Sequence, residues 1–298
     1  MDRMMITPFI AGRGGRVQAE IAGALVRAGF DVDDVPDAEL DLLDRRACRR
    51  AVARAHADVV IDCNGADDVG CVTALSTDEL LVGVENLARA AAKENAHSIF
   101  ISNASVFGDV WGGPRVESDP PAPTSAIGDA LLHAERITAR VNGQHTILRS
   151  TTLYGARWGL VADLIGRVHA GERILIEACP VWAPTYAPHF ADVLVTLARR
   201  PCYGILHRAA SGECTQLDFA RAVTTLVDHQ YRLELSPAAS QHNMPETAPA
   251  CLATRRPGFP VIPHWRIGLR LCALESEDLR RPARQNATRT LLGNGTPP

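Results

Sequence analysis

The sequence has no long apolar run, no strong charge imbalance and almost no lysine. No hydrophobic stretch approaches the roughly 18 residues that a membrane span requires, and the first residues contain no apolar core of a signal peptide. The net charge of −3 over 298 residues gives no electrostatic reason to expect nucleic acid or a membrane surface as a partner. These absences predict a cytoplasmic protein that binds neither.

The shortage of lysine limits the chemistry that the chain can perform. Lys93 is the only lysine, so nearly all positive charge comes from arginine. The eight cysteines are scattered through apolar segments without any CxxC pair, which favours buried, reduced thiols over disulfides. No group of cysteines and histidines has the spacing of zinc ligands, so we expect no metal.

Strand-like and helix-like segments alternate through the first half of the chain. Short apolar strands are expected at residues 8–11, 30–35, 58–63, 97–102 and 145–150. Amphipathic helices are expected between them, at residues 17–28, 44–56, 77–95 and 125–141. This alternation predicts an α/β protein with a doubly wound parallel sheet.

A glycine-rich turn, Gly-Arg-Gly-Gly-Arg-Val-Gln at 12–18, follows the first expected strand. Glycines there permit positive φ and close approach of a pyrophosphate, and the start of the next helix supplies free N–H donors, as in Rossmann folds. Gln18 replaces the third glycine of such turns and is expected to push the helix outward. A tight turn without a ligand is the alternative to a dinucleotide site. The residues predicted to bind the cofactor are Gly12, Arg13, Gly14, Gly15, Arg16, Asp41 and Leu42.

The pattern becomes less regular beyond Tyr154. Helix-like stretches are expected at 160–170, 191–199 and 216–227, and residues 236–263, with six prolines, are expected to form a long surface excursion. The residues after 293 are expected to be disordered. We predict a Rossmann-like dinucleotide-binding domain at 1–155. A smaller, mixed α/β substrate-side domain is predicted at 156–298, with some of its segments returning to the first domain.

Several segments, in the same order along the chain, resemble the nucleotide-sugar-binding, dTDP-4-dehydrorhamnose reductase-like branch of the extended short-chain dehydrogenase/reductases. The segments are ELDLLD at 39–44, DVVIDC at 58–63, SNASVFG at 102–108, RSTTLYG at 149–155, APTY at 183–186 and HRAASGECTQLDFA at 207–220. Each is a weak match alone, and their shared order makes the resemblance specific.

The resemblance implies a Tyr-x-x-x-Lys pair that works with a serine or threonine during NAD(P)H-dependent reduction. The tyrosine would protonate the carbonyl oxygen and the lysine would lower its pKa and hold the nicotinamide ribose. In this sequence Ile127 and Leu131 occupy the tyrosine and lysine positions, and Asn103 occupies the hydroxyl position. Neither aliphatic side chain can exchange a proton or donate a hydrogen bond. Because Leu131 cannot contact the nicotinamide ribose as the lysine would, we expect NAD(P) binding to be weakened or absent.

Other polar groups could act in the expected cleft. Some follow the fourth strand, at the carboxyl end where open α/β sheets bind ligands, and others lie in segments that face the substrate in the resembling family. His133 or His189 could act as a general base near neutral pH, although a lone histidine is more often structural. The candidate catalytic residues are Asn103, Ser105, His133, Tyr154, Tyr186 and His189.

These features predict an atypical short-chain dehydrogenase/reductase-like protein that binds a small-molecule or nucleotide-type ligand in the cleft. The main interpretation is an enzyme of secondary metabolism with non-redox or unusual chemistry. One alternative is a non-catalytic binding or regulatory subunit. The other is a nucleotide-sugar 4-ketoreductase that uses a substitute acid. The sequence leaves open whether the protein forms a homodimer.

Overall fold

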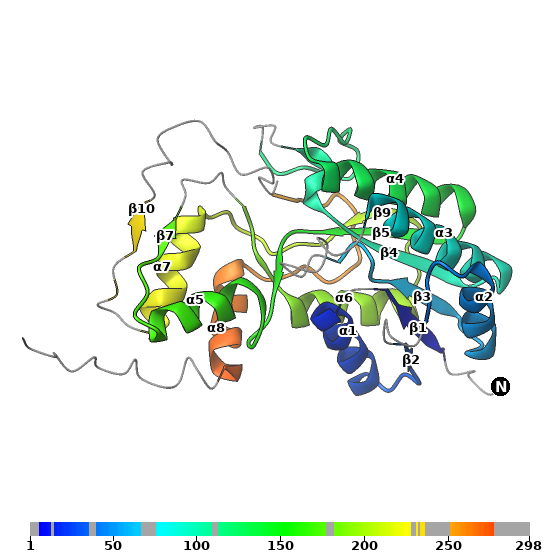
Figure 1. Ribbon diagram of the computed structural model, residues 1–298, viewed down its shortest axis with the longest axis horizontal. Helices are drawn as coiled ribbons and strands as arrows, with labels where there is room; N and C mark the ends of the chain where they lie inside the picture. Colours follow the sequence, from blue (N-terminus) through cyan, green and yellow to red (C-terminus); the bar gives the residue numbers. More distant parts are fainter. Residues whose placement is uncertain are drawn as a thin grey trace, which may run out of the picture.

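A six-stranded parallel sheet forms the centre of the fold (Figure 1). The computed structural model describes residues 6–12, 15–35, 40–66, 76–108, 113–176, 182–227, 231, 233–235 and 251–276. Across the sheet, the strands are β2 (Asp33–Asp34), β1 (Pro8–Ala11), β3 (Val59–Asp62), β4 (His97–Asn103), β5 (His145–Ser150) and β9 (Gly204–His207). All neighbouring strands run parallel, so their carboxyl ends share one edge. The strand order reverses direction between β1 and β3, which is where open α/β sheets place their ligand crevice.

Helices cover both faces of this sheet. On one face α1 (Gly15–Arg27) packs against α6 (Ala187–Arg199). On the other, α2 (Arg45–Arg54), α3 (Thr77–Lys93) and α4 (Ala126–Val141) pack side by side (Figure 1). Apolar residues on both faces of each strand explain the two layers: Ile61 joins the core beneath α1, whereas its neighbour Val60 joins the core beneath α2. The predicted α/β fold with a doubly wound parallel sheet is confirmed.

A buried ion pair fixes α4 to the sheet. The guanidinium of Arg149 on β5 donates to both carboxylate oxygens of Glu135, at 2.8 and 2.6 Å, and the hydroxyl of Ser102 on β4 donates to the same carboxylate at 2.7 Å. Both charged side chains are almost completely buried. The position of α4 beside the carboxyl end of β4 is therefore set by directional contacts as well as by apolar packing.

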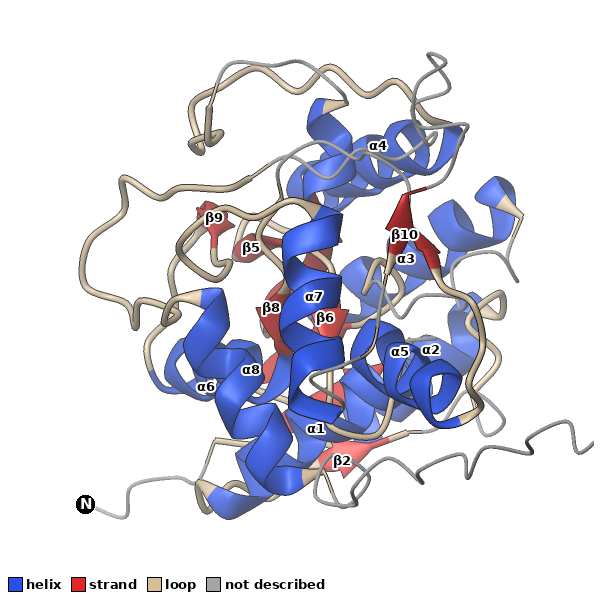
Figure 2. Cartoon of the chain, turned by 90° about the vertical axis from the view of Figure 1, so that its left-hand side faces the viewer, coloured by secondary structure: helices blue, strands red, loops and turns tan. Residues whose placement is uncertain are grey.

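The remaining elements gather beside one end of the sheet (Figure 2). They comprise three helices and two small parallel strand pairs: α5 (Gly159–His169), α7 (Gln216–Val227), α8 (Trp265–Glu275), β6 (Leu153–Tyr154) with β8 (Thr185–Tyr186), and β7 (Leu175–Ile176) with β10 (Glu234–Leu235). Two segments beyond residue 155, β9 and α6, belong to the sheet half. The domain boundary at 155 itself stays a prediction.

The structure differs from the sequence expectations mainly at the edges. The strand expected at 30–35 is reduced to the two residues of β2, and α8 was not expected. Most of the proline-rich segment and the chain after 276 lie outside the described residues. The six described cysteines are buried and free, and Cys71 and Cys179 are not described. Within the described ranges no helix is long and apolar enough to cross a membrane.

Candidate active site

The glycine turn after β1 makes a close backbone contact with the loop that follows β3. Gly12 has a φ of 120°, and a Cβ added there would lie 2.7 Å from the amide nitrogen of Asn64. Only glycine fits this position. Gly15, with a φ of 47°, begins α1, whose first turn contains no acidic residue. The glycine-only position at Gly12 and a first helical turn without an acidic residue, the parts of this turn that the structure describes, suit a phosphate group.

The other predicted phosphate-turn residues are placed only in part. Arg16 is exposed at the start of α1, and Arg13 and Gly14 lie outside the described residues. Since their side chains and backbone directions are not described, their contact with a phosphate stays a prediction.

Gln18 ties α1 to the end of β2. Its side chain is buried, and its amide nitrogen donates to the carboxylate of Asp34 at 2.7 Å and to the carbonyl of Val35 at 3.1 Å. Asp34 is exposed and ends the second strand, about 20 residues after the glycine turn, where Rossmann folds carry the acid that binds the adenosine ribose. The sequence reasoning missed this residue, although its spacing from Gly12 could have revealed it.

The loop after β3 brings a buried carboxyl to the same edge of the sheet. Asp62 accepts from the backbone and side-chain nitrogens of Asn64, at 2.9 and 2.8 Å. Burial raises the pKa of Asp62 to about 7, even though both hydrogen bonds from Asn64 act in the opposite direction. This titrating group, also missed from sequence, lies in the crevice where β1 and β3 end.

Leu42 borders the same loop, whereas Asp41 closes a local turn. Leu42 is buried against Gly83 of α3, and Gly83 in turn approaches the side chain of Asn64. The carboxylate of Asp41 is exposed and accepts from the backbone of Leu43 at 2.9 Å. Of the two residues predicted near an adenine, Leu42 is the one that adjoins the loop touched by Gly12.

Asn103 and Ser105 form a polar pair at the end of β4. The side-chain oxygen of Asn103 accepts from the backbone nitrogen of Ser105 at 2.9 Å and from its hydroxyl. The first turn of α4 lies directly against this pair, because a Cβ added at Gly128 would lie 2.4 Å from the carbonyl oxygen of Ser105. The structure therefore joins the polar end of β4 to the start of the helix that carries Ile127.

The two aliphatic residues on α4 are packed among apolar neighbours. Leu131 has no exposed surface, and its side chain lies beside Gly65, in the loop after β3. Ile127, one turn earlier, is half-buried against the same hydrophobic cluster. At the positions that the resemblance gives to a tyrosine and a lysine, α4 thus offers apolar surface and no hydrogen-bond donor.

Tyr154, Tyr186 and His189 lie in a second cluster, beside α7 and α8. The phenol of Tyr154 is completely buried, stacks near Tyr186 and Phe219, and has no hydrogen-bond partner among the described residues. The hydroxyl of Tyr186 donates to Glu275 of α8 at 2.6 Å, and its ring meets the edge of His189.

Ionisation of these groups is also shifted. Burial raises the pKa of Tyr154 and of Tyr186 well above the ordinary tyrosine value, which makes both phenols weaker acids. Burial lowers the pKa of His189, against the opposing effect of Asp192 and Glu275, which favours the neutral imidazole. This cluster suits a neutral hydrogen-bonding site better than proton donation by tyrosine.

His133 faces solvent on α4, on the side of the helix opposite the buried Leu131. The structure does not bring it to the polar pair at the end of β4. Among the described residues there is no group of three or more histidine, cysteine or acidic side chains that could hold a metal.

The crevice therefore combines three elements around the carboxyl ends of β1, β3 and β4. They are a phosphate-compatible turn at Gly12, a carboxyl that titrates near neutral pH at Asp62, and an amide–hydroxyl pair at Asn103 and Ser105. The turn suits a phosphate group and the amide–hydroxyl pair suits hydrogen bonding to a carbonyl oxygen, while Ile127 and Leu131 of α4 present apolar surface.

Sequence comparison shows which known proteins this chain is similar to. Residues 5–273 match the family described as RmlD substrate binding domain. A dTDP-4-dehydrorhamnose reductase of Mycobacterium tuberculosis H37Rv is 28% identical over 283 residues, covering 90% of this chain and 91% of that protein. A spore coat polysaccharide biosynthesis protein of Bacillus subtilis is 24% identical over 74% of this chain and 78% of its own length.

Solved structures show the same fold at lower identity. A dTDP-4-dehydrorhamnose reductase of Bacillus anthracis in complex with NADP superposes with a TM-score of 0.79 at 21% identity, covering 93% of this chain and all of that one. A UDP-glucose 4-epimerase of Thermotoga maritima with UDP-glucose gives a TM-score of 0.71 at 18% identity, covering 83% and 90%. The chain therefore belongs to the RmlD substrate binding domain family, within the extended short-chain dehydrogenase/reductases.

Proposed function

We propose that this protein binds a nucleotide-linked keto sugar together with NAD(P) in the crevice at the carboxyl ends of β1, β3 and β4, and reduces the 4-keto group with a substitute for the tyrosine. Membership of a family whose matched relatives are named as dTDP-4-dehydrorhamnose reductases supports the substrate class and the reduction. The observation that carries the chemistry is the polar pair of Asn103 and Ser105 beside the first turn of α4.

The residues present fit part of a dinucleotide. The glycine-only position at Gly12 and the N-terminus of α1 would receive the pyrophosphate, and Asp34 would receive the adenosine ribose. When bound, the reduced nicotinamide supplies a hydride to the carbonyl carbon. Leu131 cannot hold the nicotinamide ribose as a lysine would, so we expect weak affinity.

Asn103 would take the first role in catalysis. Its side-chain oxygen accepts hydrogen bonds from the backbone and the hydroxyl of Ser105. The amide nitrogen of Asn103 would therefore be the atom that donates to a substrate carbonyl. Such a donor stabilises the negative charge that develops on the oxygen. The proton that completes the alcohol then comes from water, because the single hydroxyl proton of Ser105 is donated to Asn103. Without an acidic side chain, the rate should be lower by a factor of about 10²–10⁴ than with general-acid help.

The test is NAD(P)H consumption with dTDP-linked 4-keto-6-deoxy sugars. We expect slow turnover that falls at least about tenfold in Asn103→Ala, because one donor to the developing oxyanion is lost. His133→Ala, on the solvent side of α4, serves as the control and should leave the rate unchanged. Turnover that is insensitive to Asn103→Ala and Ser105→Ala would contradict this mechanism.

Coenzyme choice is a second, separable test. The carboxylate of Asp34 would repel the 2′-phosphate of NADPH, so we expect tighter binding of NADH. Asp34→Ser should lower the ratio of the NADPH dissociation constant to the NADH dissociation constant by about tenfold, measured by fluorescence titration. Equal affinities in the unmodified protein would show that Asp34 does not reach the ribose.

A second candidate function is redox-neutral chemistry or ligand binding without catalysis. It is favoured by one observation, the apolar surface of Ile127 and the fully buried Leu131 where proton transfer would occur. Binding of a dTDP-sugar without any consumption of NAD(P)H would support it over reduction.

A further inference from the structure

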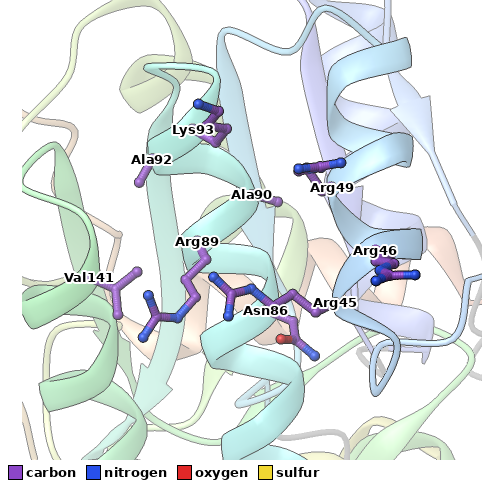
Figure 3. A pocket seen from close by; sticks show the side chains of 9 residues that line it. All are labelled: Arg45, Arg46, Arg49, Asn86, Arg89, Ala90, Ala92, Lys93 and Val141. Atoms are coloured by element: carbon purple, nitrogen blue, oxygen red, sulfur yellow. The ribbon is translucent and has the colours of Figure 1, made fainter.

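A positively charged groove lies on the outer surface of the helix layer, between α2 and α3 (Figure 3). It has a volume of about 920 Å³, and no acidic residue is among the described side chains that line it. Five of the lining residues are cationic: Arg45, Arg46, Arg49, Arg89 and Lys93. The net charge of the chain is −3, so this local excess of positive charge does not follow from composition.

One end of the groove adjoins the segment of Leu42, because Asn86 in its lining donates to the carbonyl of Leu42 at 2.9 Å, and the other end leads away from the crevice. Lys93 is the last residue of α3 and Val141 the last of α4, and helices in such a fold run opposite to the strands. The groove therefore extends towards the amino edge of the sheet, and its lining shares no residue with the Gly12 turn or the Asn103 pair.

The arrangement of these cations destabilises the protein on its own. Arg45 and Arg49 are four residues apart on α2, where like charges repel across one helical turn. Arg45 also lies in the first turn of α2, where the only acidic neighbour in sequence is Asp44, whose carboxylate caps the helix by accepting from the backbone of Arg46 at 2.7 Å. Of the five cations that line the groove, only Arg89 has an ion pair with a described residue, Glu85, at 2.6 Å. A bound anion would relieve the repulsion between Arg45 and Arg49.

The geometry favours a small ligand with several phosphates. Arg45 and Arg49 of α2 extend towards α3, Arg89 of α3 extends towards Val141 at the end of α4, and arginine forks bind phosphate oxygens in pairs (Figure 3). Ala90, Ala92 and Val141 add apolar surface to the lining, and the volume matches that of pockets for nucleotide-sized molecules. We propose that this groove is a binding site for a small anion carrying two or more phosphates, distinct from the proposed reductase site.

The test is calorimetric titration of the full-length protein at low ionic strength with inorganic triphosphate and, separately, with a nucleoside triphosphate. We expect both to bind at one site, since the phosphates are the shared chemistry. Tighter binding of the nucleotide would identify nucleotides as the source, and equal binding would identify inorganic polyphosphate. Arg45→Gln/Arg49→Gln should weaken binding at least about tenfold through the loss of charge-assisted contacts.

The matched control is Arg136→Gln/Arg140→Gln, the same change at the same spacing on exposed positions of α4 outside the groove. It should weaken binding less than about twofold, an effect of net charge alone. Thermal unfolding without ligand should show that the α2 double variant is at least as stable as the unmodified protein, because a repulsion is removed.

Three results would overturn the proposal. They are no binding of either probe, equal weakening in the two double variants, and tighter, variant-sensitive binding of RNA or an acidic peptide than of triphosphate. The last result would assign the groove to a macromolecular polyanion instead.

Discussion

At the scale of single residues, Asp62 makes stability depend on pH. Burial raises its pKa from the ordinary 3.8 to about 7, so the folded protein retains a proton that the unfolded chain releases. Its contribution to the free energy of unfolding is therefore greatest below pH 4 and falls as the pH rises to about 7. Asp62→Asn keeps the shape of the side chain and removes its charge. Between pH 5 and pH 8, the free energy of unfolding of this variant should therefore fall by roughly 2 kcal/mol less than that of the unmodified protein.

Urea unfolding of the two proteins at pH 5 and pH 8 measures this difference directly. Asp58→Asn, an exposed carboxyl just before the same strand, is the control and should leave the pH dependence as it is in the unmodified protein. Parallel pH profiles for the Asp62 variant and the unmodified protein would mean that Asp62 is ionised in the fold.

Glu135 should contribute far more to the free energy of unfolding than an exposed carboxylate whose ion pair is equally short. Glu135→Gln leaves the guanidinium of Arg149 buried without its counter-charge, which costs about 3–5 kcal/mol in comparable pairs. Glu85→Gln breaks an ion pair of the same 2.6 Å length between partly exposed side chains and should cost under about 1 kcal/mol. Denaturant unfolding measures both, and similar losses in the two variants would argue against a tight buried pair.

At the scale of elements, α4 decides whether the missing catalytic pair can be restored. Leu131→Lys places an ammonium where the native side chain has no exposed surface, so we expect a loss of several kcal/mol. Leu131→Met, of similar volume, should cost less than about 1.5 kcal/mol. Ile127→Tyr with Leu131→Lys should restore at most a trace of 4-keto reduction, and either change alone should add none, since the two groups act as a unit.

Reductase assays and thermal unfolding of the same four proteins separate the two effects. A double variant that is stable and fully active would show that α4 keeps an open nicotinamide site, contrary to the packing of Leu131 beside Gly65.

The elements of the first half could be predicted because each has a local signal. The apolar run Val59–Asp62 and the helical period and capping box of α3, with Ser76 bonded to Glu79, are properties of short segments. Helix α8 was missed because it follows a proline-rich stretch and contains Gly268. A residue with a Cβ is excluded there, since that atom would lie 2.8 Å from the side chain of Tyr186. That approach depends on tertiary packing.

The site was less predictable for the same reason. Gln18 was expected to push α1 outward, but its amide instead connects α1 to Asp34, a contact that depends on how a helix and an edge strand meet. The shifted pKa of Asp62 depends on complete burial, which no run of neighbouring residues encodes. The glycine turn could be predicted from sequence because the positive φ at this position requires a glycine, and Gly12 is itself that residue.

At the scale of the whole molecule, the sheet half depends on chain that lies beyond its apparent boundary. A fragment of residues 1–155 would lack β9, which pairs with β5, and α6, which covers α1. Removal of α6 would expose apolar residues of the core beneath α1, such as Ile21 and Leu25. We expect this fragment to show no cooperative thermal unfolding by circular dichroism, whereas residues 1–276 should unfold in one transition. A cooperative transition for the short fragment would show an autonomous domain.

The position of Lys93 has a practical consequence for labelling. It is the only lysine of the chain, and it lies at the rim of the basic groove. Apart from the α-amino group of the chain, an amine-reactive dye can therefore attach only at Lys93, and a fluorophore or surface linkage on that side chain reports from the groove without any engineered cysteine. Digestion with a lysine-specific protease should likewise give just two peptides, and protection of that one bond by a bound anion would be read on a simple gel.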